Sequence, residues 1–374
     1  MDGWSWAWRA PRESAAEGVD VVEGVVVGDW AAATAAAAAA RFVSFDDVLG
    51  KIATLAKDQH GCRYLQMKLE EGNPVYVKSV FDECFDGFVD LMVDPFGNYL
   101  CQKLFEHCDD VLQLALIQHS APALAQVSTD MHGTRAVQRM IECLQTEAQI
   151  QAICDALRPA AVDLMEDING NHVIQRCLHK MEPKHNQFVF DVVSRNCFEL
   201  ATHRHGCCVI QRSMDYASTL QRNQVVEEIS KNALALVQDA FGNYVVQYVL
   251  ELGEPVYTLY IIRNLMGHLA ELSVQKFSSN AIEKCLQLAE PDVRVPLIEE
   301  LISNYNTVGK LLHDGFGNYV LQRVLMVAMS PQLERVCEAI RPHLASLKTS
   351  PYGKRIQTKI LKLFPRGMLH ELEK

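Results

Sequence analysis

Eight pairs of polar side chains recur along this chain, with the two members of each pair four residues apart. The pairs are Cys62/Gln66, Asn98/Gln102, Thr134/Gln138, Asn171/Gln175, Cys207/Gln211, Asn243/Gln247, Ser279/Glu283 and Asn318/Gln322. Residues four apart lie on one face of an α-helix, so each pair predicts two hydrogen-bonding groups that act together. Such groups suit the polar edge of an unstacked nucleic-acid base. We call these eight sets the polar pairs.

The residue directly after the first member of each polar pair is mostly flat or planar. These residues are Arg63, Tyr99, Arg135, His172, Cys208, Tyr244, Asn280 and Tyr319. A planar side chain can stack on a base, so each pair is accompanied by a stacking platform. One Asn and Gln four apart would by itself only support a solvated helix. Eight pairs in a fixed register are not explained by helix support, and they predict binding.

Six of the eight pairs are followed directly by a basic residue. These residues are Lys103, Arg139, Arg176, Arg212, Lys284 and Arg323. One interpretation is a positive ladder that contacts a nucleic-acid backbone. The other is ion pairing within the same helix, to a background of nearby acids that includes Glu70, Glu106, Glu142 and Glu251,. The sequence leaves both interpretations open.

The elements that position the pairs follow from a fixed period. The glycine before each pair, replaced once by Ser278, recurs at intervals of 36, 36, 37, 36, 36, 36 and 39 residues. Periods of this length are typical of solenoids. Apolar residues recur three and four apart, as on amphipathic helices, and alternating strand patterns are nearly absent. We predict an all-α solenoid, in which the loop 239–242 precedes a helical run over 243–250 and the residue after each glycine helps to cap that run.

Composition excludes several functional classes. The 12 cysteines form no CxxC pair, which indicates reduced thiols and argues against a zinc site,. No catalytic triad, metal-ligand cluster or phosphate-cradling loop is visible among the 13 histidines and other polar residues, so we expect neither an enzyme nor a cofactor,. The net charge of −11 is weak evidence against a nucleic-acid partner, since one face of an acidic solenoid can still be basic,.

Residues 1–42 share nothing with the repeats. This segment holds all four tryptophans and an alanine-rich run over 31–40, while acids and glycines interrupt its apolar stretches. It therefore offers no membrane-spanning helix of about 20 apolar residues. We interpret it as a low-complexity, disordered tail, with a tryptophan-based docking motif as the alternative.

The repeated phrase resembles that of the Pumilio (PUF) family of single-stranded RNA-binding proteins. The resemblance covers about residues 43–371 and rests on HGCRYLQ at 60–66, FGNYVVQ at 241–247 and FGNYVLQ at 316–322. It implies a Pumilio homology domain over 43–374. Its expected form is a right-handed, crescent-shaped α-solenoid of eight repeats with flanking half-repeats. The phrase YGKRIQ at 352–357 looks like the degenerate C-terminal repeat.

The resemblance also implies a reading code, in which each repeat reads one base and the C-terminal repeat lies nearest the RNA 5′ end. Asn with Gln corresponds to uracil, Cys or Ser with Gln to adenine, and Ser with Glu to guanine. The implied target is 5′-UGUAUAUA-3′. This sequence departs from the family pattern at Cys208, where a planar residue is usual, and at Thr134, where Cys or Ser is usual. Asn280 is flat and polar, which the family tolerates.

The function implied by the resemblance is post-transcriptional regulation. A monomeric protein would bind 3′ untranslated regions of messenger RNA and lower translation or stability by recruiting effector proteins. We expect those effectors on the convex face and on the longer connection at about 288–314, and we expect cytoplasmic residence because no polybasic run is present,. Two rivals remain: a protein-only scaffold such as an armadillo or HEAT solenoid, and a ribosome-biogenesis factor with little base preference.

Overall fold

A computed structural model describes residues 44–347 together with Tyr352 and Ile356. The tail at 1–42 and most of the phrase at 352–357 lie outside the described residues. Every regular element in the described part is a helix, which confirms the all-α prediction. None of the helices in that part is both long enough and apolar enough to cross a membrane.

Each polar pair lies near the start of a helix of 10 to 12 residues. We call these the pair helices: α3 (Gln59–Glu70), α6 (Gly97–His107), α9 (Gly133–Cys143), α12 (Gly170–Lys180), α15 (Gly206–Asp215), α18 (Gly242–Glu251), α21 (Ser278–Leu288) and α24 (Gly317–Val327). Helix α18 contains the predicted run over 243–250 and begins one residue earlier, at Gly242, which the sequence placed at the end of the loop 239–242.

Two further helices complete each repeat. A short helix precedes the pair helix: α2 (Ile52–Leu55), α5 (Phe88–Met92), α8 (Leu124–Thr129), α11 (Ala161–Glu166), α14 (Cys197–Thr202), α17 (Ala233–Leu236), α20 (Leu269–Leu272) and α23 (Tyr305–His313). A third helix follows it: α4 (Pro74–Cys84), α7 (Asp110–Ser120), α10 (Glu147–Leu157), α13 (Pro183–Arg195), α16 (Thr219–Lys231), α19 (Pro255–Leu265), α22 (Pro291–Leu301) and α25 (Gln332–Ile340). The remaining elements are the 3₁₀ turns η1 (Asp46–Val48), η2 (Ala121–Ala123), η3 (Arg158–Ala160) and η4 (Arg341–His343), and α26 (Leu344–Leu347).

The longer interval before the eighth pair is helical rather than an open loop. It contains α22 and α23, and α23 spans nine residues where the other short helices span four to six. The extra length therefore extends a packed helix.

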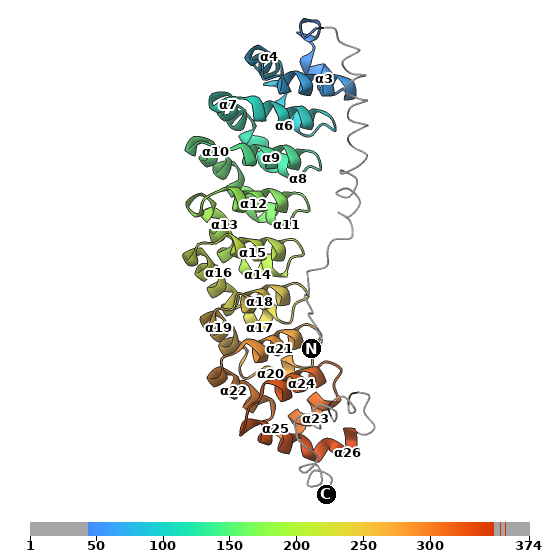
Figure 1. The fold of residues 1–374 in the computed structure, drawn as a ribbon, viewed down its shortest axis with the longest axis vertical. Coiled ribbons are helices and arrows are strands. Elements are labelled where there is room, and N and C mark those ends of the chain that lie inside the picture. Colours follow the sequence, from blue (N-terminus) through green and yellow to red (C-terminus); the bar gives the residue numbers. More distant parts are fainter. Residues whose placement is uncertain (1–43, 348–351, 353–355, 357–374) are drawn as a thin grey trace. The chain divides into compact units, whose positions relative to one another are not determined.

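The chain divides into two compact units at residues 192 and 193. In the first unit α6 packs between α3 and α9, and α9 packs against α12. In the second unit α18 packs between α15 and α21, and α21 packs against α24. Within each unit successive pair helices thus lie side by side, while the third helices form a separate row (Figure 1). This is the layered packing of a solenoid, in which each repeat buries its apolar face against its neighbours.

The repeated glycine is required by the close approach of the preceding short helix. A Cβ atom at Gly133 would lie 2.4 Å from the carbonyl oxygen of Val127, and one at Gly206 would lie 2.4 Å from that of Leu200. Ser278 occupies the same place in the seventh repeat, where its hydroxyl donates a 2.6 Å hydrogen bond to the carbonyl oxygen of Leu272. The serine is accepted because its side chain satisfies the carbonyl that it approaches.

We predict that Gly133→Ala destabilises the protein by about 1–3 kcal/mol, because the added methyl group overpacks the contact with Val127. Gly87→Ala is the matched control, since Gly87 has a φ of −96° and a Cβ there meets nothing within 4 Å. Urea unfolding of both variants tests the difference. Equal stability of the two variants would contradict the requirement for glycine.

Candidate nucleic-acid interface

An aspartate lies three residues before the repeated glycine in six of the eight repeats. Its Oδ1 atom accepts a hydrogen bond of 2.7 to 2.8 Å from the glycine N–H; these residues are Asp58, Asp94, Asp130, Asp167, Asp239 and Asp314. In the fifth repeat His203 Nδ1 accepts from Gly206 at 3.4 Å instead. A carboxylate at this point satisfies N–H groups that the helix leaves open, and it complements the helix dipole. Sequence reasoning missed these residues, although their phase with the glycines was visible.

The first member of each polar pair is buried, with 5% of its surface or less exposed in all eight repeats. In the asparagine repeats the side-chain amide turns back to the loop: Asn98 Nδ2 donates to the carbonyl oxygens of Asp94 and Pro95 at 2.9 and 3.1 Å. The prediction that this residue caps the helix was therefore wrong. The aspartate accepts from the helix N–H groups, whereas the asparagine donates to the loop carbonyls.

The second member of six pairs donates its Nε2 hydrogen to the first member. These bonds span 2.8 to 3.1 Å and involve Gln66, Gln102, Gln138, Gln175, Gln247 and Gln322. The bond fixes the rotation of the glutamine amide. One N–H and the carbonyl oxygen of that amide then form an adjacent donor and acceptor, which match the donor and acceptor on a uracil or adenine edge.

Gln211 in the fifth repeat departs from this arrangement. It is half-buried on α15, one turn after Cys207, as the sequence predicts. The Cys207 thiol, however, donates to the carbonyl oxygen of Arg204 in its own loop at 3.2 Å, and its sulfur lies 4.0 Å from that of Cys208. Within the described residues Gln211 and Cys207 are not joined by a hydrogen bond. The structure thus places Gln211 at the expected position, but Cys207 does not orient its amide.

The stacking candidates are more exposed than the pairs beside them. Tyr99 and Tyr319 are 47% and 42% exposed, and Arg135, His172 and Asn280 are also exposed. The other three, Arg63, Cys208 and Tyr244, are half-buried. The second pair members are half-buried as well, except for Gln322, which is buried. A ligand could therefore meet the pair with its edge while the neighbouring side chain covers its face.

Thr134 makes the same kind of hydrogen bond as Cys62 makes at the equivalent position of the first repeat. The Cys62 thiol donates to the carbonyl oxygen of Phe96 at 3.1 Å, and the Thr134 hydroxyl donates to that of Asn169 at 3.1 Å. Each bond reaches the loop of the next repeat. Burial raises the pKa of the Cys62 thiol to about 11, so the thiol remains a neutral donor at physiological pH,.

The basic residues that follow the pairs are engaged in ion pairs. In the first unit Lys103 contacts Glu106 at 3.1 Å, Arg139 contacts Glu106 at 2.8 Å and Glu142 at 2.6 Å, and Arg176 contacts Glu142 at 3.0 Å. Lys103 also lies 3.5 Å from Glu70. Acids and bases alternate across four successive pair helices, and we call this row the acid–base ladder. Of the two interpretations of these residues, the structure supports ion pairing, although three of these five pairs join neighbouring helices rather than lying within one.

Ion pairs engage the basic residues of the second unit as well. Arg212 lies 3.3 Å from Asp215, and Lys284 contacts Glu251 of the preceding repeat. Arg323 lies 3.7 Å from Glu283, which is itself a member of a polar pair. The first of these pairs lies within one helix, and the other two join neighbouring repeats.

Comparison with known proteins identifies the repeat. The family model for the Pumilio-family RNA binding repeat matches eight segments: 51–83, 87–119, 124–158, 161–194, 196–230, 232–266, 268–302 and 313–341. Pumilio domain-containing protein C6G9.14 of Schizosaccharomyces pombe is 44% identical over 314 residues, which are 84% of this chain and 46% of that protein. The chain belongs to the Pumilio family. Pumilio homolog 12 of Arabidopsis thaliana is also 44% identical, over 84% of this chain and 53% of its own, so the chain spans about half the length of these relatives.

Solved Pumilio structures share the fold. The Puf4 RNA binding domain bound to the HO endonuclease RNA 3′ UTR recognition sequence is 41% identical, with a TM-score of 0.74 over 83% of this chain and 99% of that one. The RNA-binding domain of yeast Puf5p bound to MFA2 RNA is 30% identical, with a TM-score of 0.75 over 84% of this chain and 96% of that one. The predicted family and its solenoid of eight repeats are thereby confirmed.

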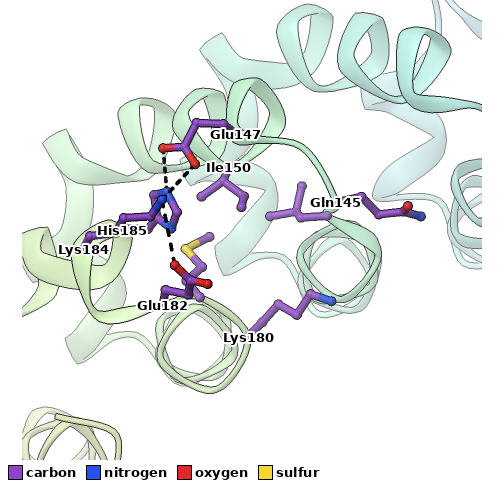
Figure 2. A pocket seen from close by; sticks show the side chains of 9 residues that line it. Gln145, Glu147, Ile150, Lys180, Glu182, Lys184 and His185 are labelled. Atoms are coloured by element: carbon purple, nitrogen blue, oxygen red, sulfur yellow. Dashed lines mark hydrogen bonds and ion pairs between the residues drawn. The ribbon is translucent and has the colours of Figure 1, made fainter. Parts of the chain in front are cut away.

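A cavity of about 230 Å³ lies apart from the polar pairs of these Pumilio repeats. Figure 2 shows it beside α10 and α13, where His185 Nε2 lies 2.7 Å from Glu147 Oε1 and Lys184 lies 3.3 Å from Glu147. Leu144, Ile150 and other side chains line it, and none of them belongs to a polar pair. In the described part of the chain no group of three or more His, Cys, Asp or Glu residues could hold a metal ion.

The acid–base ladder predicts a pH-dependent part of the stability. Partial burial alone raises the pKa of Glu106, but hydrogen bonds from Arg139 and Lys103 outweigh burial and leave that pKa lowered. A lowered pKa in the folded state stabilises the fold above the unfolded-state pKa, and this stabilisation is lost as the pH falls through the folded-state pKa.

We therefore predict that Glu106→Gln costs about 0.5–1 kcal/mol at pH 7 and that this cost shrinks as the pH falls from about 5 to about 3. Urea unfolding over that pH range measures it. Glu271→Gln, at an exposed position of α20, is the control. A cost for Glu106→Gln that is independent of pH would contradict the role of the ladder.

Proposed function

We propose that this protein binds single-stranded RNA in a sequence-specific manner, with one base read by each repeat, and regulates messenger RNA translation and stability. The observation that carries the proposal is the same hydrogen-bonded polar pair, fixed in six repeats beside a stacking candidate. The RNA-bound Pumilio structures to which this chain is similar support the ligand class. A protein-only scaffold would not require the amides of successive repeats to share one orientation.

The proposed target is 5′-UGUAUAUA-3′, read from the eighth repeat to the first. The Asn/Gln pairs would read uracil, because their amides can offer a donor and an acceptor to its edge. The Cys/Gln and Thr/Gln pairs would read adenine, with Thr134 equivalent to Cys62 because both donate to the next loop. Glu283 would read guanine, because a carboxylate accepts from both the N1–H and the 2-amino group.

The fourth base, an adenine, would be read by Cys207 and Gln211. Because Cys207 does not orient the Gln211 amide, the base itself would have to orient that amide on binding. Ordering a side chain on binding reduces the net gain from its hydrogen bonds. We therefore expect the adenine at the fourth position to gain less binding free energy from Gln211 than the other bases gain from glutamines that are held by their first pair member.

Stacking is worth about 1–3 kcal/mol per base, and eight such contributions cannot simply add, because the total would exceed the affinities that noncovalent complexes reach. We propose that the UGUA half, read by repeats five to eight, dominates the affinity. The regulatory activity would depend on effector proteins bound away from the polar pairs, in the cytoplasm.

A fluorescence-anisotropy titration of the full chain tests base reading. We expect UGUAUAUA to bind at least about a hundredfold more tightly than ACAUAUAU at a salt concentration near 150 mM, a difference of about 2.7 kcal/mol. Equal binding of the two RNAs would instead indicate a nonspecific factor. Failure to bind either RNA would point to a protein scaffold.

A second prediction concerns the code itself. The double variant Ser279→Asn with Glu283→Gln should prefer uracil to guanine at the second base, because it recreates the pair of the neighbouring repeats. The reciprocal variant, Asn243→Ser with Gln247→Glu, should change the third base from uracil to guanine and leave the second base unaffected. Titration with UGUAUAUA, UUUAUAUA and UGGAUAUA measures both changes. Guanine preference at the second base in the first variant would refute the assigned pair.

A further inference from the structure

The seventh repeat carries its acid at a different place from the repeats before it. In five of the first six repeats an acid follows the second pair member by four residues, and these acids are Glu70, Glu106, Glu142, Asp215 and Glu251. In the seventh repeat that place is taken by Gln287, and the acid is instead the pair member Glu283. The seventh repeat thus has its carboxylate in the polar pair, rather than four residues later where five of the first six repeats place an acid.

The basic residue of the next repeat faces this displaced carboxylate. Arg323 lies on α24, which packs against α21, and its Nε atom is 3.7 Å from Glu283 Oε2. The two side chains are 28% and 25% exposed, so water screens their charges only in part,. The Nε atom is buried and makes no hydrogen bond. At this distance the guanidinium compensates the charge of the carboxylate while Nε occupies none of its lone pairs.

The equivalent arginines behave differently in the first unit. Arg139 contacts Glu106 and Glu142, and Arg176 contacts Glu142, all of them acids outside the polar pairs. These arginines therefore compensate ladder acids, whereas Arg323 compensates an acid that would touch a base. Arginines at the same position of the repeat thus pair with acids that have different proposed roles.

We propose that Arg323 is a positioning residue that gives the Ser279/Glu283 pair its preference for guanine. This inference rests on the proposed function, in which Glu283 reads the second base. The carboxylate must stay ionised and correctly oriented to accept from both guanine donors, and RNA phosphates would add negative charge near it. Arg323 offsets that charge from the neighbouring helix. Without Arg323, guanine loses part of its advantage over a base that presents acceptors.

The test compares Arg323→Met with Arg139→Met, which removes the equivalent arginine where the polar pair of the preceding repeat, Asn98/Gln102, contains no acid. The full chain is titrated with UGUAUAUA, UUUAUAUA and UAUAUAUA. We expect Arg323→Met to lower the preference for guanine at the second base by about tenfold, within the range of coupling between contacting residues. Arg139→Met should leave that preference unchanged, and Arg323→Lys should retain most of it.

A double-mutant cycle separates positioning from a merely structural role. In the Ser279→Asn, Glu283→Gln background no carboxylate remains to be compensated, so Arg323→Met should change the ratio of uracil to guanine binding by less than about twofold. Thermal unfolding followed by circular dichroism checks that each variant folds, and Arg323→Gln replaces Arg323→Met if the latter does not.

The outcomes distinguish the two proposals. Unchanged guanine preference in Arg323→Met, or an equal loss in Arg139→Met, overturns the role of Arg323 and leaves base reading intact. A wild-type protein that binds UGUAUAUA and ACAUAUAU equally overturns the proposed function itself.

Discussion

The close contact between each short helix and the repeated glycine is the constraint on which the rest of the structure depends. Where a Cβ atom would collide with a carbonyl oxygen six residues earlier, as at Gly61, Gly133 and Gly206, only hydrogen fits. The contact fixes where the pair helix begins and therefore which residues lie in its first turn. Because it recurs in nearly every repeat, the first turns of successive pair helices present equivalent positions. Ser278 satisfies the constraint by a different route, through a hydrogen bond to the carbonyl oxygen that would otherwise repel it.

Fixed in this way, the first turn contains a chain of dependent hydrogen bonds. Asp94 accepts from the Gly97 N–H, Asn98 donates to the loop that Asp94 begins, and Gln102 donates to Asn98. Each bond restricts the group that makes the next one, and the amide of the glutamine is oriented before any ligand arrives. A site that is already oriented loses less entropy on binding than one that must be ordered. The loops before the pair helices thus help to orient the candidate interface.

The fold and the candidate site could be predicted from the sequence to different extents. The period, the all-α class and the polar pairs follow from spacing, because one glycine-led phrase recurs with the helix register. Sequence reasoning did not resolve the third helix of each repeat, and it assigned the capping role to Asn98 when Asp94 performs it. The pairing of Arg139 with Glu142, three residues later, is visible in the sequence, whereas its pairing with Glu106 is not, because Glu106 lies 33 residues away and meets Arg139 only when two repeats pack. Such contacts depend on how two repeats pack, which the sequence of one repeat does not specify.

The acid–base ladder affects how strongly this surface would attract nucleic acid regardless of its sequence. A protein with free lysines and arginines attracts any polyanion, and the release of counterions then supplies affinity that is independent of sequence. Here Lys103, Arg139 and Arg176 already have carboxylate partners, so an approaching nucleic acid meets a nearly neutral row. In the proposed function, affinity would then come mainly from the base edges and faces. The ion pairs that join the repeats would therefore also lower the binding of RNA that lacks the target sequence.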